Sequence, residues 1–172
     1  MMIQKKSAGR GCNSHRGLFN IRMIEESYER LRKEHKLPEF DSLNNEFEIS
    51  IIDSEEFLVR EIRRKITEKI CFFTDIIGGV INTESSASAM LELGNITEED
   101  IKKGFSVYRK LMYWERYSAE LSALSDDNKE AEFIRKFYEE WIVLKMDIAT
   151  TISKIKETWK MSDEKKSEAY FS

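Results

Sequence analysis

The chain has 172 residues, of which 35% are charged and one is proline, and no apolar run approaches the ~20 residues of a membrane-spanning helix. Few helix-breaking residues and long periodic runs of apolar side chains favour an all-helical protein with no membrane association. Residues 1–22 hold five of the 28 basic residues and no acidic residue, so the rest of the chain has 23 basic against 32 acidic residues. This acidic body argues against nonspecific binding of nucleic acid.

Residues 1–22 are rich in glycine, serine and arginine and show no helical period. We expect a disordered basic extension here; the alternatives are an arm that contacts nucleic acid and a targeting peptide. Cys12 in this extension and Cys71 in a predicted helix are poorly placed for a disulfide, which favours a cytoplasmic protein in a reducing interior. We expect a single domain over residues 23–160 and a frayed polar tail over residues 161–172.

A short helical hairpin is predicted at the start of this domain. Its first helix extends from Met23 to Lys36 and ends before Pro38, because a residue that precedes proline disfavours the helical conformation. Asp41 is expected to cap a brief second helix. Three apolar residues anchor that helix to the rest of the protein: Phe40, Leu43 and Phe47. Three further residues predict a buried, extended connection to the next helix: Ile49, Ile51 and Ile52.

The stretch from Ser54 to about Ile81 predicts a long amphipathic helix around which the rest of the protein is built. Its apolar residues recur at steps of three and four, the spacing of one helical face. These residues are Leu58, Ile62, Ile66, Ile70, Phe73, Ile77 and Val80. Ser54 is the expected N-terminal cap, and Gly78 and Gly79 are expected to fray the last turn.

A long loop of small and polar residues is predicted over 82–96, with a helical turn over 87–93. We expect this loop to be mobile rather than functional. The next helix starts with a clear local signal, because Thr97 and Asp100 have the spacing of a capping box. We call it the third helix, because it follows the hairpin and the long central helix. It is predicted to end at about Ala123.

The last helix is predicted from Asp127 to Trp159 or beyond, after a turn over residues 125–128. Its apolar residues keep the three- and four-residue steps of a bundle. They are Ile134, Phe137, Trp141, Leu144, Ile148, Ile152, Ile155 and Trp159. The short turn implies that the third and last long helices run antiparallel. The sequence therefore predicts an all-α fold: an antiparallel helical bundle of three long helices plus a short N-terminal helical hairpin.

The usual signatures of catalysis and of cofactor binding are missing from the sequence. There is no glycine-rich phosphate loop, no nucleophile elbow and no E-x-x-H pair. Cys12 and His15 have the spacing of two zinc ligands, but the chain has no second such pair. We therefore expect no metal, no cofactor and no catalytic residue.

Three charged residues lie on helical faces that should be apolar. Arg63 falls at the edge of the central stripe, and Glu115 lies near the middle of the third helix's apolar arc. Lys145 lies between Trp141 and Ile148 on the last helix. One interpretation is a buried ion-pair network in which Glu115 meets Lys145 or Arg63. The other is that Arg63 and Lys145 extend their charged ends to solvent over the rim of the core.

A run of basic and aromatic residues between positions 108 and 117 is the main candidate for an interaction surface. Core packing accounts for most of its aromatics, which leaves Tyr113 and Tyr117 for a partner. Together with Arg60 and Arg64 of the central helix they form the candidate interaction surface. Protein docking is favoured over nucleic acid as its role.

Two segments resemble a group of small uncharacterised archaeal all-helical proteins: Leu37–Ile49 (LPEFDSLNNEFEI) and Phe57–Ile66 (FLVREIRRKI). The resemblance covers roughly Met23 to Trp159 and leaves out residues 1–22. It implies an archaeal, cytoplasmic protein and brings no assigned activity and no catalytic residue to this chain.

The function that these observations favour is that of a non-enzymatic helical adaptor that binds another macromolecule, in the first place a protein. It would use exposed aromatics and the ends of its long helices. Two alternatives stay open. An accessory factor on RNA or the ribosome would use the basic extension with Arg60, Arg64 and Lys65. An enzyme would have a polar site around the three charged residues on apolar faces.

Overall fold

The computed structural model describes residues 13–81 and 96–170. In chain order the elements are α1 (Asn13–His35), α2 (Phe40–Phe47), the 3-10 turn η1 (Ile49–Ile51), α3 (Leu58–Ile81), α5 (Glu98–Leu124) and α6 (Asp127–Tyr170). The described residues contain no strand, which confirms the predicted all-α class.

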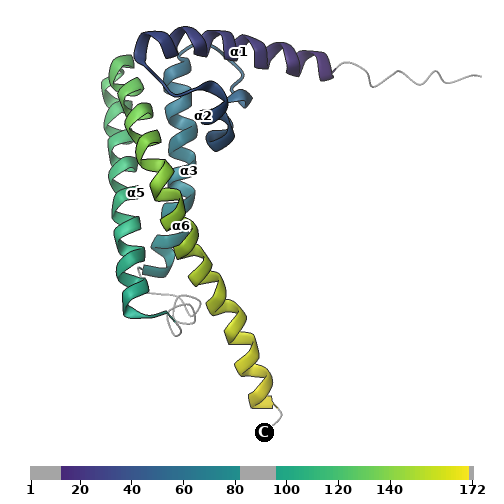
Figure 1. Ribbon diagram of the computed structural model, residues 1–172, viewed down its shortest axis with the longest axis vertical. Helices are drawn as coiled ribbons and strands as arrows, with labels where there is room; N and C mark the ends of the chain where they lie inside the picture. Colours follow the sequence, from purple (N-terminus) through teal and green to yellow (C-terminus); the bar gives the residue numbers. More distant parts are fainter. Residues whose placement is uncertain (1–12, 82–95, 171–172) are drawn as a thin grey trace, which may run out of the picture.

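The three long helices α3, α5 and α6 lie side by side along the long axis of the molecule, and α6 crosses in front of the other two and continues beyond them (Figure 1). The helix α1 lies across their upper end, and α2 packs beside the upper part of α3. Only residues 125 and 126 connect α5 to α6, so these two helices run antiparallel. The predicted bundle with its N-terminal hairpin is therefore the observed architecture.

The apolar stripe of α3 forms the centre of the core. Of the predicted stripe residues only Phe73 is half-buried, and the others are at most 6% exposed. Ile66 and Ile70 have no exposed surface at all. This stripe faces both α5 and α6, which is why α3 organises the bundle.

A row of aromatic rings fills the space between α5 and α6. The ring of Trp114 meets Phe133 and Phe137 edge-on, each at 5.3 Å between centroids. Phe137 in turn lies 5.8 Å from Trp141, and Trp141 lies 6.0 Å from Phe73 of α3. The row therefore links all three long helices, and it leads from the core to the surface beside α3.

Tyr28 anchors the N-terminal hairpin. Its hydroxyl donates a hydrogen bond to the carbonyl oxygen of Pro38 at 2.8 Å, and its ring meets Phe40 edge-on at 5.4 Å. Burial raises the pKa of Tyr28, so the hydroxyl keeps its proton and remains a donor. Three residues of α2 are buried against the bundle as predicted: Phe40, Leu43 and Phe47.

Two helix ends differ from the prediction. The helix α1 begins at Asn13 rather than Met23, so the predicted extension over residues 1–22 is helical in its second part, and residues 1–12 lie outside the described part. The helix α6 reaches Tyr170, past the predicted start of a frayed tail at residue 161. Both helices lengthen at the ends of the domain because adding a residue to an existing helix costs far less than starting one.

The start of α3 also differs, since the helix begins at Leu58 and Ser54 is not its cap. The hydroxyl of Ser54 accepts a hydrogen bond from the backbone amide of Glu56 at 3.1 Å, a local turn that competes with helix. Phe57 then adopts a left-handed conformation with φ of 54°, which separates this turn from the helix. At the other end α3 continues through Gly78 and Gly79 to Ile81, the predicted end of the helix.

Two predictions for the short elements are wrong. The N-terminal cap of α2 is Glu39, and Asp41 lies within the first turn. The predicted extended connection is the 3-10 turn η1, where Ile49 is buried and Ile51 is 56% exposed. The predicted cap of the third helix is confirmed, because the Thr97 side chain accepts from the backbone amide of Asp100 at 3.2 Å. The predicted loop over 82–96 lies almost wholly outside the described residues.

Candidate functional site

A buried ion pair joins the three long helices at their upper end. Arg63 of α3 is 3% exposed, and its Nε donates to Oε2 of Glu130, which is fully buried in the first turn of α6. Its Nη1 donates to the carbonyl oxygen of Ser118 at 3.1 Å and also to the Ser118 hydroxyl. Its Nη2 donates to the hydroxyl of Ser122 at 3.0 Å. Each guanidinium nitrogen thus has a partner within the bundle.

The hydroxyl of Thr67 completes this network, in which every hydroxyl has a hydrogen-bond partner within the bundle. The hydroxyl of Thr67 lies 2.6 Å from that of Ser118 and donates to the carbonyl oxygen of Arg63 at 2.8 Å. Oε1 of Glu130 is buried without a hydrogen bond, and Nε of Arg60 lies 4.0 Å from it. A buried pair of this kind fixes how helices face one another, because either ion alone would be costly to bury.

Arg63 is the one residue of the predicted polar site that the structure buries, and its partner is not the predicted one. Glu130 lies four residues before Ile134, so it continues the apolar stripe of the last helix by one more step. That position in the stripe was the signal that sequence reasoning missed. Ser118 and Ser122 of α5 supply the hydroxyls that accept from Arg63.

Glu115 and Lys145 do not form the predicted pair. The Glu115 side chain is 23% exposed, and its nearest cation is the guanidinium of Arg116 at 3.5 Å. Lys145 donates instead to a carboxylate of α2, that of Glu46. The offset of several residues along the antiparallel helices separates Glu115 from Lys145. Arg63 and Glu115 line one hollow between α3 and α5 without an ion pair between them, whereas Lys145 lines a different one, so the three residues do not form one site.

The group around Glu46 ties the last turn of α2 to α3 and α6. Its carboxylate accepts from Lys145 and, at 2.8 Å, from the indole Nε1 of Trp141. Partial burial opposes its ionisation, but the hydrogen bonds from Lys145 and Trp141 outweigh burial and hold the pKa of Glu46 below its usual value. The ammonium group of Lys69 donates to the backbone carbonyl of Glu46 and lies 5.1 Å from the centre of the Trp141 ring.

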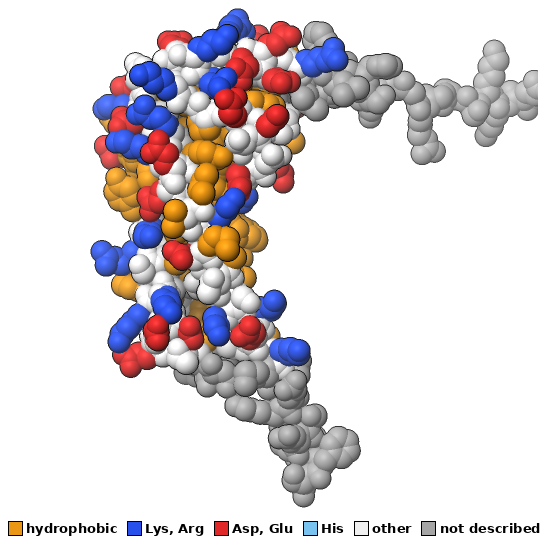
Figure 2. Space-filling view, viewed as in Figure 1, with side chains coloured by type: hydrophobic (Ala, Val, Ile, Leu, Met, Phe, Trp, Pro, Cys, Tyr) orange, Lys and Arg blue, Asp and Glu red, His pale blue; other side chains and the backbone are white. Residues whose placement is uncertain are grey.

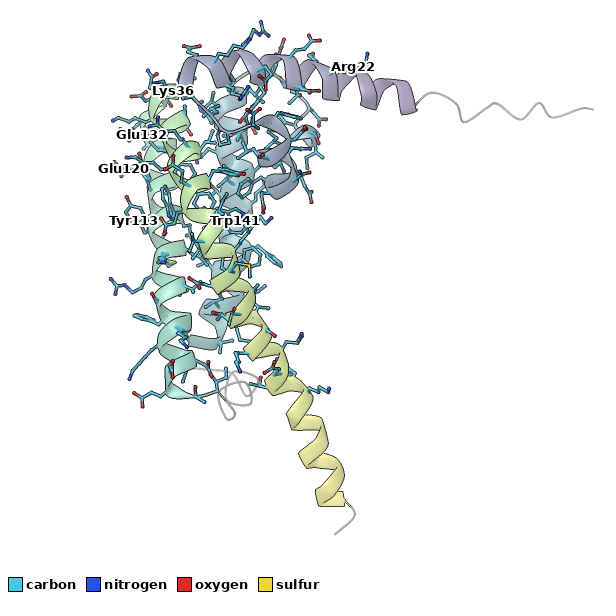
Figure 3. The ribbon with its side chains drawn as sticks, in the orientation of Figure 1. Arg22, Lys36, Tyr113, Glu120, Glu132 and Trp141 are labelled. Atoms are coloured by element: carbon cyan, nitrogen blue, oxygen red, sulfur yellow. The ribbon has the colours of Figure 1, made fainter. Side chains whose placement is uncertain are left out.

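A groove opens between α3 and α6 where α2 ends. It begins at the Glu46 group, follows α6 from Trp141 to Lys156 and has a volume of about 430 Å³. Its apolar lining comes from Phe73, Trp141, Ile148, Ala149 and Ile152, and its charged lining comes from Glu46, Lys69, Lys145 and Lys156. We call this the α3–α6 groove. Figure 3 shows Trp141 on α6, at the place where that helix crosses α3. In the same view α2 lies above Trp141.

Large apolar side chains are exposed on both sides of this groove. Phe72 of α3 is 60% exposed, and its ring lies 5.2 Å from that of Phe73 in the groove. On α6, Ile142 is 49% and Met146 is 65% exposed, on the same helical face as Lys145 and Ala149. In Figure 2 apolar side chains gather over the middle of the molecule, with basic side chains next to them.

The four residues of the predicted interaction surface have different neighbours. Arg60 lies 5.1 Å from the centre of the Phe57 ring, and Arg64 forms an ion pair with Glu61 at 2.6 Å. Tyr113 is 63% exposed on α5, and the half-buried Tyr117 packs against Phe133 of α6 at 5.6 Å. Figure 3 places Tyr113 on the left-hand edge of the molecule, away from Trp141 and the α3–α6 groove.

The described residues offer little reactive chemistry elsewhere. No three His, Cys, Asp or Glu side chains within them are grouped so that they could hold a metal ion. Cys71 is a half-buried free thiol. Burial, with a smaller contribution from Glu115 and Asp75, raises the pKa of this thiol, which disfavours the nucleophilic thiolate.

Comparisons with family models, with curated proteins and with solved structures found no match to this chain. Within the described part of the chain, no helix has the length and apolar character needed to cross a membrane. The α3–α6 groove, the Arg63–Glu130 pair and the group around Glu46 are therefore the features that bear on function.

Proposed function

We propose that this protein is a non-enzymatic adaptor that binds another protein through the α3–α6 groove. The observation that carries the proposal is a groove that α2 fills only at its upper end. Below Glu46 the half-buried side chains of Phe73 and Ile152 and the exposed Ala149 continue the apolar surface, with no helix over them among the described residues. Exposed apolar side chains next to a groove of this kind are typical of a surface that a partner covers.

The charges on α3 favour a protein partner over RNA. The RNA alternative would use three cations of α3, and each lies beside a carboxylate: Arg60 near Glu130, Arg64 with Glu61 and Lys65 with Glu68. The phosphate backbone needs cations that are free to replace its counterions. A binding surface built from these three residues would first have to break existing ion pairs.

The buried network favours a structural role for Arg63 over catalysis. Its guanidinium nitrogens are all hydrogen-bonded within the bundle, and the hydroxyls around it are bonded to one another or to backbone carbonyls. A substrate would have to displace these partners to reach the group. We therefore place the function on the surface and not in this network.

The test uses a substitution that fills the groove without touching the core. Ala149 is exposed and lines the groove, so Ala149→Trp fills it with an indole ring; Ser106→Trp on the exposed face of α5 is the matched control. Full-length protein immobilised on a support is used to capture partners from an extract of its own cells. The captured protein is then purified, and its binding is measured by calorimetry.

We expect the purified partner to bind the wild-type chain and the Ser106→Trp variant equally and to lose at least about tenfold in affinity for Ala149→Trp, since a filled groove excludes the partner. Circular dichroism of both variants checks that the helices persist. Equal binding by Ala149→Trp would show that the partner docks elsewhere and would remove the groove from the proposed function.

A further inference from the structure

The lining of the α3–α6 groove differs in charge from the rest of the protein. The chain as a whole is acidic, with a formal net charge of −4. The groove has three lysines, Lys69, Lys145 and Lys156, against the single carboxylate of Glu46. The local excess of positive charge is therefore a property of this surface and does not follow from composition.

The three lysines have different partners. Lys145 is paired with the Glu46 carboxylate, and Lys69 is bonded to the Glu46 backbone carbonyl. Lys156 is exposed, and it forms no ion pair with any carboxylate among residues 22–81 and 96–160, the part of the chain whose side chains the structure describes. Lys69 also lies near enough to the Glu46 carboxylate to help lower its pKa, so Lys69 and Lys145 share one carboxylate at the upper end of the groove, and Lys156 is the exposed cation at its lower end.

The length of the groove along α6 fits a helix. α6 forms its long wall, α3 lines its upper part with Lys69 and Phe73, and the upper end already holds the last turn of α2, which packs Phe47 against Trp141 at 5.5 Å. From Trp141 to Lys156 it follows α6 for about 22 Å at 1.5 Å per residue, the length of about four helical turns. A helix laid there would place apolar residues at i, i+3, i+4 and i+7 on Phe73, Ala149 and Ile152.

We infer that the partner segment that binds this groove is an amphipathic helix with carboxylates beside its apolar face. The inference rests on the proposed function and adds the chemistry of the partner. Carboxylates along the edge of such a helix lie beside Lys69 and Lys156, while its apolar face covers the groove floor. Nucleic acid fits this surface less well, because the Trp141 ring on the floor is 2% exposed and offers no open face for base stacking.

The probe is a labelled amphipathic helical peptide of about 18 residues with leucine at the i, i+3, i+4 and i+7 positions and glutamate at the flanking positions. A second peptide has lysine in place of every glutamate, and a third keeps the composition of the first with its leucines spread over all faces. Each is titrated with the full-length chain and followed by fluorescence anisotropy at about 50 mM and about 300 mM salt.

We expect the glutamate peptide to bind at least about tenfold more tightly than either control peptide, with weaker binding at the higher salt. Lys156→Glu should weaken its binding about fivefold or more, because an attraction becomes a repulsion. Lys110→Glu is the matched control: it makes the same charge change at an exposed position of α5 and should alter binding less than about twofold.

Several results would overturn the inference, and they differ in what they mean for the proposed function. If the lysine peptide binds as tightly as the glutamate peptide and Ala149→Trp blocks both, the groove binds helices but the carboxylate chemistry is wrong. If no peptide binds and Ala149→Trp leaves the natural partner bound, both claims fail. Tighter binding of a labelled single-stranded RNA, lost in Lys156→Glu, would assign the groove to nucleic acid. A dimer in solution that Ala149→Trp dissociates would make a second copy of this chain the occupant.

Discussion

Arg63 and Glu130 show how single residues define the packing of this bundle. Each would be costly to bury alone, and together they hold α3 to α6 while the Ser118 carbonyl and hydroxyl add α5. The guanidinium fork matters here, because it reaches a carboxylate, a carbonyl and two hydroxyls at the same time. The pair therefore specifies which faces of the three helices meet.

The first prediction concerns this pair. Glu130→Ala leaves the Arg63 charge buried without its carboxylate and should lower the free energy of unfolding by about 3–5 kcal/mol. Glu115→Gln, at a half-buried position whose nearest cation is exposed, should cost at most about 1 kcal/mol. Urea denaturation followed by circular dichroism measures both. A loss below about 1 kcal/mol for Glu130→Ala would mean that water reaches Arg63 and replaces the missing carboxylate.

Among the elements, α3 has two adjacent glycines that play different parts. Gly78 is buried where α3 approaches α5, and a Cβ built on it would lie 2.8 Å from Cε2 of Tyr108. Gly79 is exposed, and a Cβ there would have no neighbour within 4 Å. Only Gly78 is therefore required by the packing of the two helices.

The second prediction follows from this difference. Gly79→Ala should raise the free energy of unfolding by about 0.5–1 kcal/mol, the gain in helix propensity from glycine to alanine. Gly78→Ala brings the same gain in propensity but forces the Tyr108 ring to move, so it should bring no net gain. Thermal unfolding of the two variants in parallel measures the contrast. An equal gain from both would show that the contact between Gly78 and Tyr108 is loose.

The third prediction concerns α2, which Glu46 holds to the bundle. Because the pKa of Glu46 is lower in the folded protein than its usual value, its contribution to stability is fully present above that usual value. The contribution is lost as the pH falls below about 4 and the carboxylate takes up a proton. Glu46→Gln should remove this part of the pH dependence. Denaturant midpoints of both proteins between about pH 7 and pH 3 test it, and equal slopes would rule out the role of Glu46.

The features that sequence predicted well are those that depend on neighbours along the chain. The α3 stripe, the Thr97 cap and the turn before α6 each follow from spacings of a few residues. The partners of Arg63 and Lys145 depend on how separate helices face one another, and periodicity alone does not fix that register. The buried face of the eight-residue helix α2 was predicted correctly, but spacing within α2 does not show which residues of α3 and α6 meet the Glu46 carboxylate. The groove was missed for a related reason, because it exists only where α2 ends.

In the whole molecule, a buried network and an open groove lie at different heights of one bundle. The upper end is closed by α1, α2 and the Arg63–Glu130 pair, whereas below α2 the surface between α3 and α6 is open and apolar with lysines beside it. The contacts at the closed upper end hold α3 and α6 together above the groove, and a surface that is already formed costs less entropy to bind. The proposed function follows from this division between a rigid scaffold and an uncovered groove.

The most direct measurement is photocrosslinking from within the groove. A benzophenone amino acid replaces Ala149 in the full-length chain, and the control carries it at Ser106, which is equally exposed on α5. The chain is irradiated in an extract of the cells from which the protein comes. The groove position should then give a covalent adduct to one other protein, through an amphipathic helix with carboxylates beside its apolar face. The Ser106 position should give none. Equal adducts from both positions, or no adduct from Ala149, would contradict the assignment of the α3–α6 groove as the docking site.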